Sequence, residues 1–377
     1  MSSLYLHIPF CSSKCPYCDF FSQVGSQEQL DEYVELLNLN IRILQQKFPH
    51  NPPLETIFFG GGTPSLLSAE QIGSLLKYIK GTFDIDKNAE ITLEANPGTV
   101  DLDQLRGYRQ AGVNRLSLGI QSLNDQHLQL LGRIHTADQA QDSVIAARAA
   151  GFNNLSLDLM FALPDQDLSS LEEELSLLLE LSPEHVSLYG LSFEKGTEFA
   201  VRLQRGELTA CGENLYADQY RLLHERMNAA GFEHYEISNF ARPGSRCRHN
   251  QVYWRRQTCL ALGCGAHSFI ADGWGERWHV PSDLPTYRRK LQNGQNACEL
   301  LESFDRQAAM AETVYLALRT ADGLSRKRFR RQFGSFPEEL FPDAFRRQAE
   351  RLKLVDDSWR LDLQGWLLYD HLISAFL

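Results

Sequence analysis

Three cysteines near the start of the chain have the types and spacing to hold an iron–sulfur cluster. Cys11, Cys15 and Cys18 follow a C-x3-C-x2-C pattern. Cysteine thiolates bind such clusters, normally four to a [4Fe–4S] cubane. The next cysteine, Cys211, lies far along the chain. A triplet without a local fourth thiol could bind three irons and leave the fourth open to a second molecule. The spacing therefore predicts a reactive or exchangeable cluster.

Two other uses of these thiols stay open on spacing alone. A zinc site usually pairs two C-x2-C-like turns or adds histidines, and the spacing from His7 to Cys11 does not suit such a turn. Unrelated thiols, or a disulfide with one thiol left over, would suit a secreted protein. The first residues contain neither a basic region nor a long apolar run, so we expect no secretory signal and reduced cysteines. The five remaining cysteines are expected to be buried or incidental thiols.

A second set of candidate residues lies at or near the ends of predicted strands. The set comprises Gly60, Gly61, Gly62, Thr63, Glu94, Gln121, Arg133 and Asp158. Glycines let a ligand approach the backbone closely, and a carboxylate at a strand end can accept hydrogen bonds from ribose hydroxyls. Arg133 could pair with a ligand carboxylate in bidentate fashion. The charge of Asp158 inside an apolar strand should be paired or functional. Each residue alone fits a structural role, but together they predict a polar site beside the cysteines.

These residues depend on an alternation of strands and helices over roughly the first 230 residues. Apolar runs predict strands at 4–8, 56–59, 90–95, 115–118, 155–160 and 185–189. Helical periodicity and caps predict helices at 27–47, 68–80, 101–110, 125–131, 137–150, 168–181 and 213–230. Six β–α units in a row predict a parallel α/β sheet, either a closed or partly open barrel or a doubly wound sheet. Chemistry in such folds collects at the carboxyl ends of the strands.

The pattern changes near residue 232, and we divide the chain into domains 1–237 and 238–377. We expect an edge strand at 234–237, a polar and aromatic loop at 247–254, and a small β unit over 263–270 and 276–280. Three helices followed by two short strands near 354–363 resemble a winged-helix-like α+β domain. Its arginine-rich segment at 326–331 is better interpreted as a solvated helix face than as a DNA-binding surface.

Composition agrees with a globular protein of about two domains. The chain has 377 residues, of which 43% are hydrophobic and 23% charged, and a net charge of −11. This negative charge argues against nucleic-acid binding, which requires an excess of Lys and Arg. No apolar run reaches the ~18 residues of a membrane span, so we expect a cytoplasmic protein.

The cysteine motif and the strand-end residues together resemble the radical S-adenosylmethionine (SAM) superfamily. The resemblance covers roughly residues 1–237 and includes Tyr17, the aromatic residue before the last cysteine. It implies a partial (β/α)6 TIM-like barrel and a [4Fe–4S] cluster held by the three cysteines. SAM would chelate the open iron through its amino and carboxylate groups. It also implies that Tyr5 joins the strand-end residues in lining the SAM pocket.

Within that superfamily, the whole chain resembles the oxygen-independent coproporphyrinogen III oxidase group. The resemblance rests on H-I-P-F-C at 7–11 and G-G-T-P-S at 61–65. The oxidases carry C-x3-C-x2-C-x-C, whereas Phe20 stands where the fourth cysteine would be. The oxidases also have a segment before the cluster motif that helps to enclose substrate. We expect none here, because the motif already begins at Cys11.

An H-N-x-x-Y-W motif at 249–254 is similar to one that marks the HemW haem chaperones of this group. By this resemblance His249 could supply an axial imidazole to haem iron, while Tyr253 and Trp254 could pack on the porphyrin. The alternative is a capped loop whose aromatic side chains fill a domain interface.

The resemblance implies a haem chaperone more than an enzyme: a protein that binds haem and passes it to acceptor haemoproteins, with cluster and SAM in supporting roles. Oxidative decarboxylation of coproporphyrinogen III, or another radical SAM reaction, stays as the alternative, and SAM cleavage is compatible with each. The group's acceptors include membrane-bound respiratory enzymes, so peripheral contact with the cytoplasmic membrane and a homodimer fit the resemblance. The motifs do not specify the acceptor, the haem stoichiometry or the mode of attachment.

Overall fold

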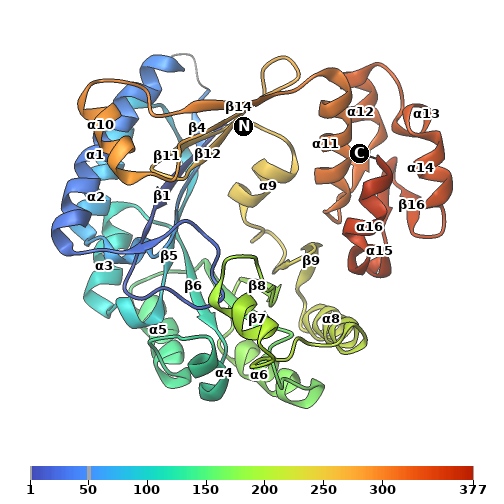
Figure 1. Cartoon of the computed structure of the whole chain (residues 1–377), viewed down its shortest axis with the longest axis horizontal. Helices are drawn as coiled ribbons and strands as arrows, with labels where there is room; N and C mark the ends of the chain where they lie inside the picture. The colour runs from blue at the N-terminus through green and yellow to red at the C-terminus, as the bar shows by residue number, and fades with distance from the viewer. Residues whose placement is uncertain (1, 49–51, 377) are drawn as a thin grey trace.

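Six parallel strands lie side by side in chain order at the centre of the computed structural model, which describes residues 2–48 and 52–376. The strands are β1 Ser2–Ile8, β4 Leu54–Gly61, β5 Ile85–Ala95, β6 Arg115–Gln121, β7 Leu155–Phe161 and β8 His185–Gly190. The helices that connect them are α1 Gln27–Lys47, α2 Ala69–Thr82, α3 Leu102–Ala111, α4 Asp125–Leu130, α5 Ala137–Ala149 and α6 Leu168–Glu180. The helices cover the outer face of the curved sheet (Figure 1). The predicted fold, a partial (β/α)6 barrel with a smaller C-terminal domain, is confirmed.

The two faces of the central strands carry different side chains. On β1, Leu4, Leu6 and Ile8 are fully buried in the core beneath the outer helices. Tyr5 and His7 point to the opposite face, because side chains alternate along a strand. In the parallel pairing of β1 with β4, Tyr5 lies opposite Phe58. The interior face of the barrel is therefore the one that carries polar and aromatic side chains.

The sheet continues beyond both edges of the parallel core into twelve strands. On one side are β10 Asn239–Ala241 and β9 Glu233–Glu236; on the other are β11 Cys259–Leu262, β12 His267–Ile270, β13 Glu276–His279 and β14 Glu299–Ser303. The small β unit that we predicted near 263–280 thus joins the main sheet, because β11 pairs in parallel with β1. The edge strand near 234–237 is confirmed as β9. The domain boundary at 237 stays a prediction, since the sheet takes strands from both sides of it.

The predicted loop at 247–254 is wrong, because residues Arg248–Trp254 form helix α9. The carboxylate of Glu90, on β5, accepts hydrogen bonds from the backbone N–H groups of Arg248 and His249 at 3.1 and 3.0 Å. A carboxylate at the first turn satisfies N–H groups that have no partner within the helix. The cap comes from a residue more than 150 positions away, so no local pattern could reveal it. Helix α9 lies inside the molecule, away from the outer ring of helices (Figure 1).

The remaining elements lie in the cysteine-rich segment after β1, in the connections around the main sheet and in the C-terminal domain. They are β2 Phe10–Cys11, β3 Gln23–Val24, α7 Glu198–Gln204, α8 Glu213–Ala229 and α10 Leu284–Gln292, then α11 Arg306–Leu318, β15 Leu324–Ser325, α12 Arg326–Phe333, α13 Pro337–Leu340, α14 Pro342–Arg347, β16 Leu352–Val355, β17 Ser358–Leu361, α15 Leu363–Leu367 and α16 Tyr369–Ile373. Three short 3-10 helices are Pro64–Leu66, Pro97–Thr99 and Ser374–Phe376. The sequence predicts the last of the three C-terminal helices at 341–353, whereas α14 covers only Pro342–Arg347, and α15 and α16 follow the predicted hairpin of β16 and β17.

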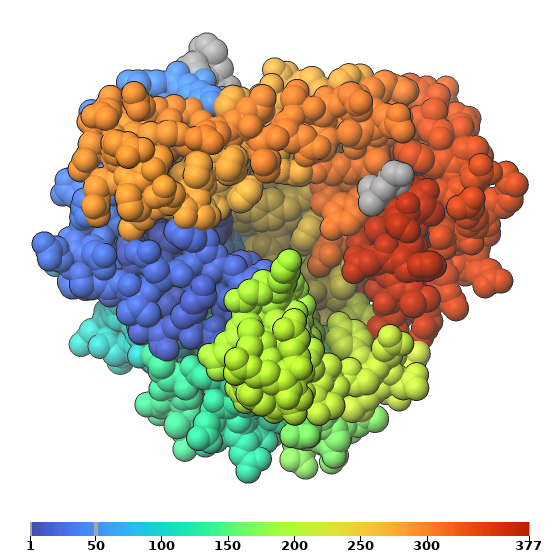
Figure 2. All heavy atoms as spheres, in the orientation of Figure 1, coloured from blue at the N-terminus to red at the C-terminus, as the bar shows by residue number. Residues whose placement is uncertain are grey.

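The C-terminal domain is joined to the barrel at strand β9. The backbone N–H of Ala321, just after α11, donates to the carbonyl of Tyr235 at 3.0 Å. Next to it, the buried carboxylate of Glu236 lies 3.3 Å from the guanidinium of Arg319. Figure 2 shows the visible face hollowed at its centre, between N-terminal residues in blue, a yellow-green segment near residues 190–215 and the red C-terminal helices. The junction at β9 therefore positions one wall of this hollow.

Replacing Glu236 with Ala should lower the free energy of unfolding by about 3 kcal/mol, because it leaves the partly buried charge of Arg319 without its partner. Urea denaturation followed by circular dichroism would measure the change. Glu233→Ala is a matched control on the same strand: its pair with Arg246 is more exposed, so its loss should cost less than about 1 kcal/mol. Equal effects of the two substitutions would contradict the assigned role of Glu236.

Candidate functional site

The three cysteines lie on one loop at the mouth of the barrel. Strands β2 and β3 pair through Phe10 with Gln23 and Cys11 with Val24, which closes the loop. Within it, the Cys18 N–H donates to the carbonyl of Cys15 at 3.1 Å. Burial raises the pKa of the Cys18 thiol, and the neighbouring Cys15 and Cys11 raise it further. Three thiols close enough to interact, none in a disulfide, form a donor set that fits a thiolate-held cluster.

The glycine stretch after β4 packs directly against this loop. The N–H groups of Gly62 and Thr63 donate to the carbonyls of Ile8 and Phe10 at 2.8 and 2.7 Å. A Cβ at Gly62 would lie 2.6 Å from the Phe10 carbonyl oxygen and 2.9 Å from Cys11 Sγ. Only glycine allows so close an approach. The glycine stretch therefore sets the position of the cysteine loop.

Two carboxylates face each other across the interior of the barrel. Glu94 accepts a hydrogen bond from the Gly61 N–H at 3.1 Å. Burial, and then the negative charge of Asp158, raise the pKa of Glu94 from 4.5 to about 8. Burial also raises the pKa of Asp158, although hydroxyl donors such as Ser117, at 3.2 Å, oppose that shift. A largely protonated Glu94 can donate as well as accept hydrogen bonds near neutral pH.

Gly60 and Tyr5 lie beside Glu94, so the predicted residues of β1, β4, β5 and β7 come together. A Cβ at Gly60 would lie 2.9 Å from the Tyr5 ring and 3.1 Å from Glu94 Oε2. Burial and the charge of Glu94 raise the pKa of Tyr5 well above its ordinary value. These contacts line one continuous interior surface next to the cysteine loop.

Gln121 and Arg133 flank the loop after β6. Gln121 has a φ of 63°, in the left-handed region that few non-glycine residues adopt. Such backbone conformations are costly and tend to occur at functional sites. The Arg133 guanidinium donates to the carbonyl of Gly119 at 2.8 Å and lies 3.5 Å from Cys15 Sγ. It brings a positive charge next to the cysteine loop, where it would stabilise a thiolate.

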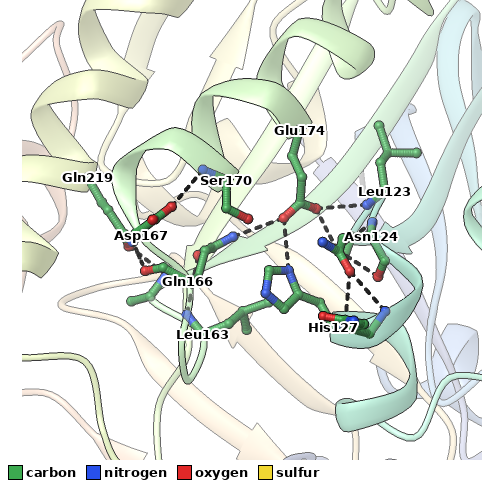
Figure 3. A network of polar contacts seen from close by, with 12 residues as sticks. Leu123, Asn124, His127, Leu163, Gln166, Asp167, Ser170, Glu174 and Gln219 are labelled. Atoms are coloured by element: carbon green, nitrogen blue, oxygen red, sulfur yellow. Dashed lines mark hydrogen bonds and ion pairs between the residues drawn. The ribbon is translucent and has the colours of Figure 1, made fainter.

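A buried carboxylate that the sequence analysis missed holds this loop in place. Glu174 on α6 accepts from Ser122 Oγ at 2.5 Å and the Leu123 N–H at 2.8 Å, and contacts His127 Nδ1 at 3.0 Å. Gln166 adds an amide donor at 3.1 Å (Figure 3). Burial alone would raise the pKa of Glu174, but these hydrogen bonds, led by that from His127, lower it instead. Glu174 is the last of three consecutive glutamates, and its place on the same helix face as Leu171, Leu175 and Leu178 is the sequence signal that could have marked it as buried.

The H-N-x-x-Y-W motif contributes to two separate places. His249 is 1% exposed, and its Nδ1 and Nε2 lie 2.6 Å from Thr56 Oγ1 and 2.9 Å from Tyr253 Oη. Burial, with the charge of Arg115, lowers the pKa of His249 to about 3. Trp254 instead lines a cavity of about 200 Å³ between α9 and the C-terminal domain. His249 and Tyr253 therefore connect α9 to the barrel, while Trp254 faces the other domain.

Two general findings concern metals and membranes. Across residues 2–48 and 52–376, no group of three or more His, Cys, Asp or Glu side chains, the three thiols of the cysteine loop included, is arranged to hold a single metal ion. Nor is any helix in those ranges long and apolar enough to cross a membrane.

Comparisons with known proteins place these features in context. The model of the Radical SAM superfamily matches residues 5–178, and that of the HemN C-terminal domain matches residues 304–368. The relatives include proteins called heme chaperone HemW. The one from Haemophilus influenzae is 36% identical, with 100% of this chain and 97% of the relative covered. The one from Bacillus subtilis is 35% identical, with 100% and 99% covered.

A solved structure supports the fold. Coproporphyrinogen III oxidase (HemN) from Escherichia coli superposes with a TM-score of 0.86 at 23% identity, covering 100% of this chain and 89% of the oxidase. At this identity the likeness establishes the architecture alone.

Replacing Glu174 with Gln should lower the free energy of unfolding by about 2 kcal/mol and weaken SAM binding, because the new amide group faces hydrogen-bond donors and the loop between Gln121 and Arg133 loosens. Urea denaturation and SAM titration would measure the two effects. Glu172→Gln on the same helix is the control: its ion pair with Arg226 is at the surface, so it should cost less than about 1 kcal/mol. Unchanged SAM binding in a destabilised Glu174→Gln variant would show that the network supports the fold only.

The raised pKa of Glu94 predicts a pH effect on stability. Its stabilising contribution is fully present below the unfolded pKa of 4.5 and is lost as pH rises through about 8. Glu94→Gln should remove this loss, so the variant should gain stability relative to wild type between about pH 5 and about pH 9. Urea denaturation across that range, without SAM, measures the difference. Glu70→Gln on the exposed surface of α2 controls for a lost carboxylate. Parallel curves for wild type and Glu94→Gln would refute the shift.

Proposed function

The chain belongs to the HemW family within the radical SAM superfamily, and from that premise we propose that it binds haem and transfers it to acceptor haemoproteins. The observation that carries the proposal is similarity over the full length of the chain to relatives called heme chaperones. Phe20, at the position of the oxidases' fourth cysteine, supports the same conclusion. Membrane-bound respiratory enzymes are the acceptor class that we propose, and a homodimer stays a prediction.

Membership of the superfamily implies a [4Fe–4S] cluster and SAM. We assign the cluster to Cys11, Cys15 and Cys18, whose donor chemistry fits it. We assign SAM to the interior surface formed by Tyr5, the glycine stretch 60–62 with Thr63, Glu94, Gln121, Arg133 and Asp158. Carbonyl groups of the glycine stretch could accept from the amino group of SAM, Arg133 could pair with its carboxylate, and Glu94 and Asp158 could accept from ribose hydroxyls. When bound, the cluster and SAM would supply redox chemistry that haem transfer does not itself require.

Oxidative decarboxylation of coproporphyrinogen III is the second candidate. It is favoured by the shared architecture with HemN. A fold can serve several activities, so this likeness does not outweigh full-length similarity to the chaperones.

The test is a haem titration of the anaerobically reconstituted protein, followed by mixing with an apo-acceptor. We expect saturable, stoichiometric haem binding and appearance of the acceptor's haem spectrum. Incubation with coproporphyrinogen III, SAM and a reductant should yield no protoporphyrinogen IX. Failure of haem to bind or to leave for the acceptor would refute the chaperone proposal. Formation of protoporphyrinogen IX would establish the enzymatic alternative.

A further inference from the structure

An axial histidine must offer iron a ring nitrogen with a free lone pair. Hydrogen bonds or close polar contacts engage both ring nitrogens of His7, His185, His224, His234 and His249. His127 and His135 each keep one ring nitrogen without such a contact, but both side chains are buried. His249 has both nitrogens engaged and is almost fully buried. To bind iron in this arrangement it would have to leave both Thr56 and Tyr253.

Three imidazoles in the described ranges 2–48 and 52–376 have no hydrogen bond to either ring nitrogen and reach the surface: His267, His279 and His371. His267 on β12 and His279 on β13 lie directly opposite each other in the antiparallel pair. Their ring centroids are 5.8 Å apart in a stacked arrangement. Directly paired residues project to the same face of a sheet. His371 lies apart from them, on α16 of the C-terminal domain.

His267 lies beside the cysteine loop. Phe21 of that loop stacks on His7, with ring centroids 6.4 Å apart, and its carbonyl contacts His7 Nε2 at 3.0 Å. The turn before His267 packs on the same loop: a Cβ at Gly265 would lie 2.8 Å from the Phe21 ring. His7 in turn contacts Tyr5 Oη at 3.1 Å. The exposed imidazole is therefore close to the interior surface that we assign to SAM.

The same loop exposes apolar surface. Phe20 and Val24 are 66% and 61% exposed, although both are large hydrophobic side chains. Both belong to the short loop that β2 and β3 close, so this loop carries exposed apolar side chains as well as the cysteines. A porphyrin offers a flat apolar face that aromatic and aliphatic side chains can cover.

We propose that His267, and not the buried His249, supplies the axial nitrogen to haem iron, with the porphyrin against the cysteine loop. The proposal rests on the proposed haem-binding function and names its ligand. The step is a ligand exchange: an Fe–N bond forms to a neutral imidazole and later breaks as an acceptor ligand replaces it, with no change of oxidation state. An exposed ligand suits transfer, because the acceptor can reach the iron.

The experiment titrates ferric haem into the reconstituted full-length protein and four variants, with alanine at His267, His279, His371 or His249. His267→Ala should weaken binding by about tenfold or more, and resonance Raman of the ferrous complex should lose the Fe–histidine stretching band. Added free imidazole should restore a nitrogen-ligated spectrum. His371→Ala removes an exposed imidazole elsewhere and should change nothing. His249→Ala should lose stability but keep the Fe–histidine band in its folded fraction.

The outcomes separate this inference from the proposed function. If wild-type protein binds no haem, the chaperone proposal itself fails. If wild type binds haem and His267→Ala keeps both affinity and the Fe–histidine band, only the ligand assignment is overturned. Loss of the band in folded His249→Ala or in His279→Ala, with His267→Ala unaffected, also overturns it. Circular dichroism of each variant establishes that it is folded.

Discussion

Arg115 carries its charge into the interior of the barrel, where 2% of its surface is exposed. A buried cation without counter-charges would cost several kcal/mol, so the surrounding residues must supply them. Burial lowers the pKa of Arg115, but Cys247, Glu90, Tyr235 and Asp158 together raise it above its ordinary value, and Glu90 and Asp158 are the carboxylates among them. Arg115 also opposes the rise in pKa of Glu94. The candidate SAM surface, the cap of α9 and the barrel interior thus share one electrostatic centre.

This centre also explains the state of the H-N-x-x-Y-W motif. Glu90, a neighbour of Arg115, caps α9 through the backbone of Arg248 and His249. The cation lowers the pKa of His249, adding to the effect of burial, and keeps it neutral. A neutral imidazole can pair with the Thr56 and Tyr253 hydroxyls at the same time. His249 is therefore part of the contact between α9 and the barrel. By contrast, His267 on β12 and His279 on β13 have ring nitrogens that are free of hydrogen bonds, as a metal ligand needs.

Two proteins of the same architecture can have different functions. The barrel, cysteine loop and C-terminal domain match those of an oxidase in overall form, yet function depends on a few side chains placed on that form. We propose that those side chains here include an exposed phenylalanine after the cysteine triplet and an imidazole pair on the extended sheet. Both are surface features, which the fold does not constrain and which selection for a different task can alter.

The sequence alone determined those helices, strands and motifs whose periodicity or spacing is contained within a short stretch of the chain. The periodicity over 27–47 predicts α1 with its observed bounds, and the apolar runs of β1, β4, β6, β7 and β8 predict a parallel α/β core. The C-x3-C-x2-C spacing places three thiols on one loop because the chain between them is too short to separate them. Tertiary structure alone decided the rest. Glu90 turns an expected loop into α9, β11 joins β1 across 250 or so residues, and Glu174 fixes a distant loop. These features depend on burial and on partners that are far apart in the chain. Their free energy of formation is set by hydrogen bonding and desolvation, and not by the spacing of residues along the sequence.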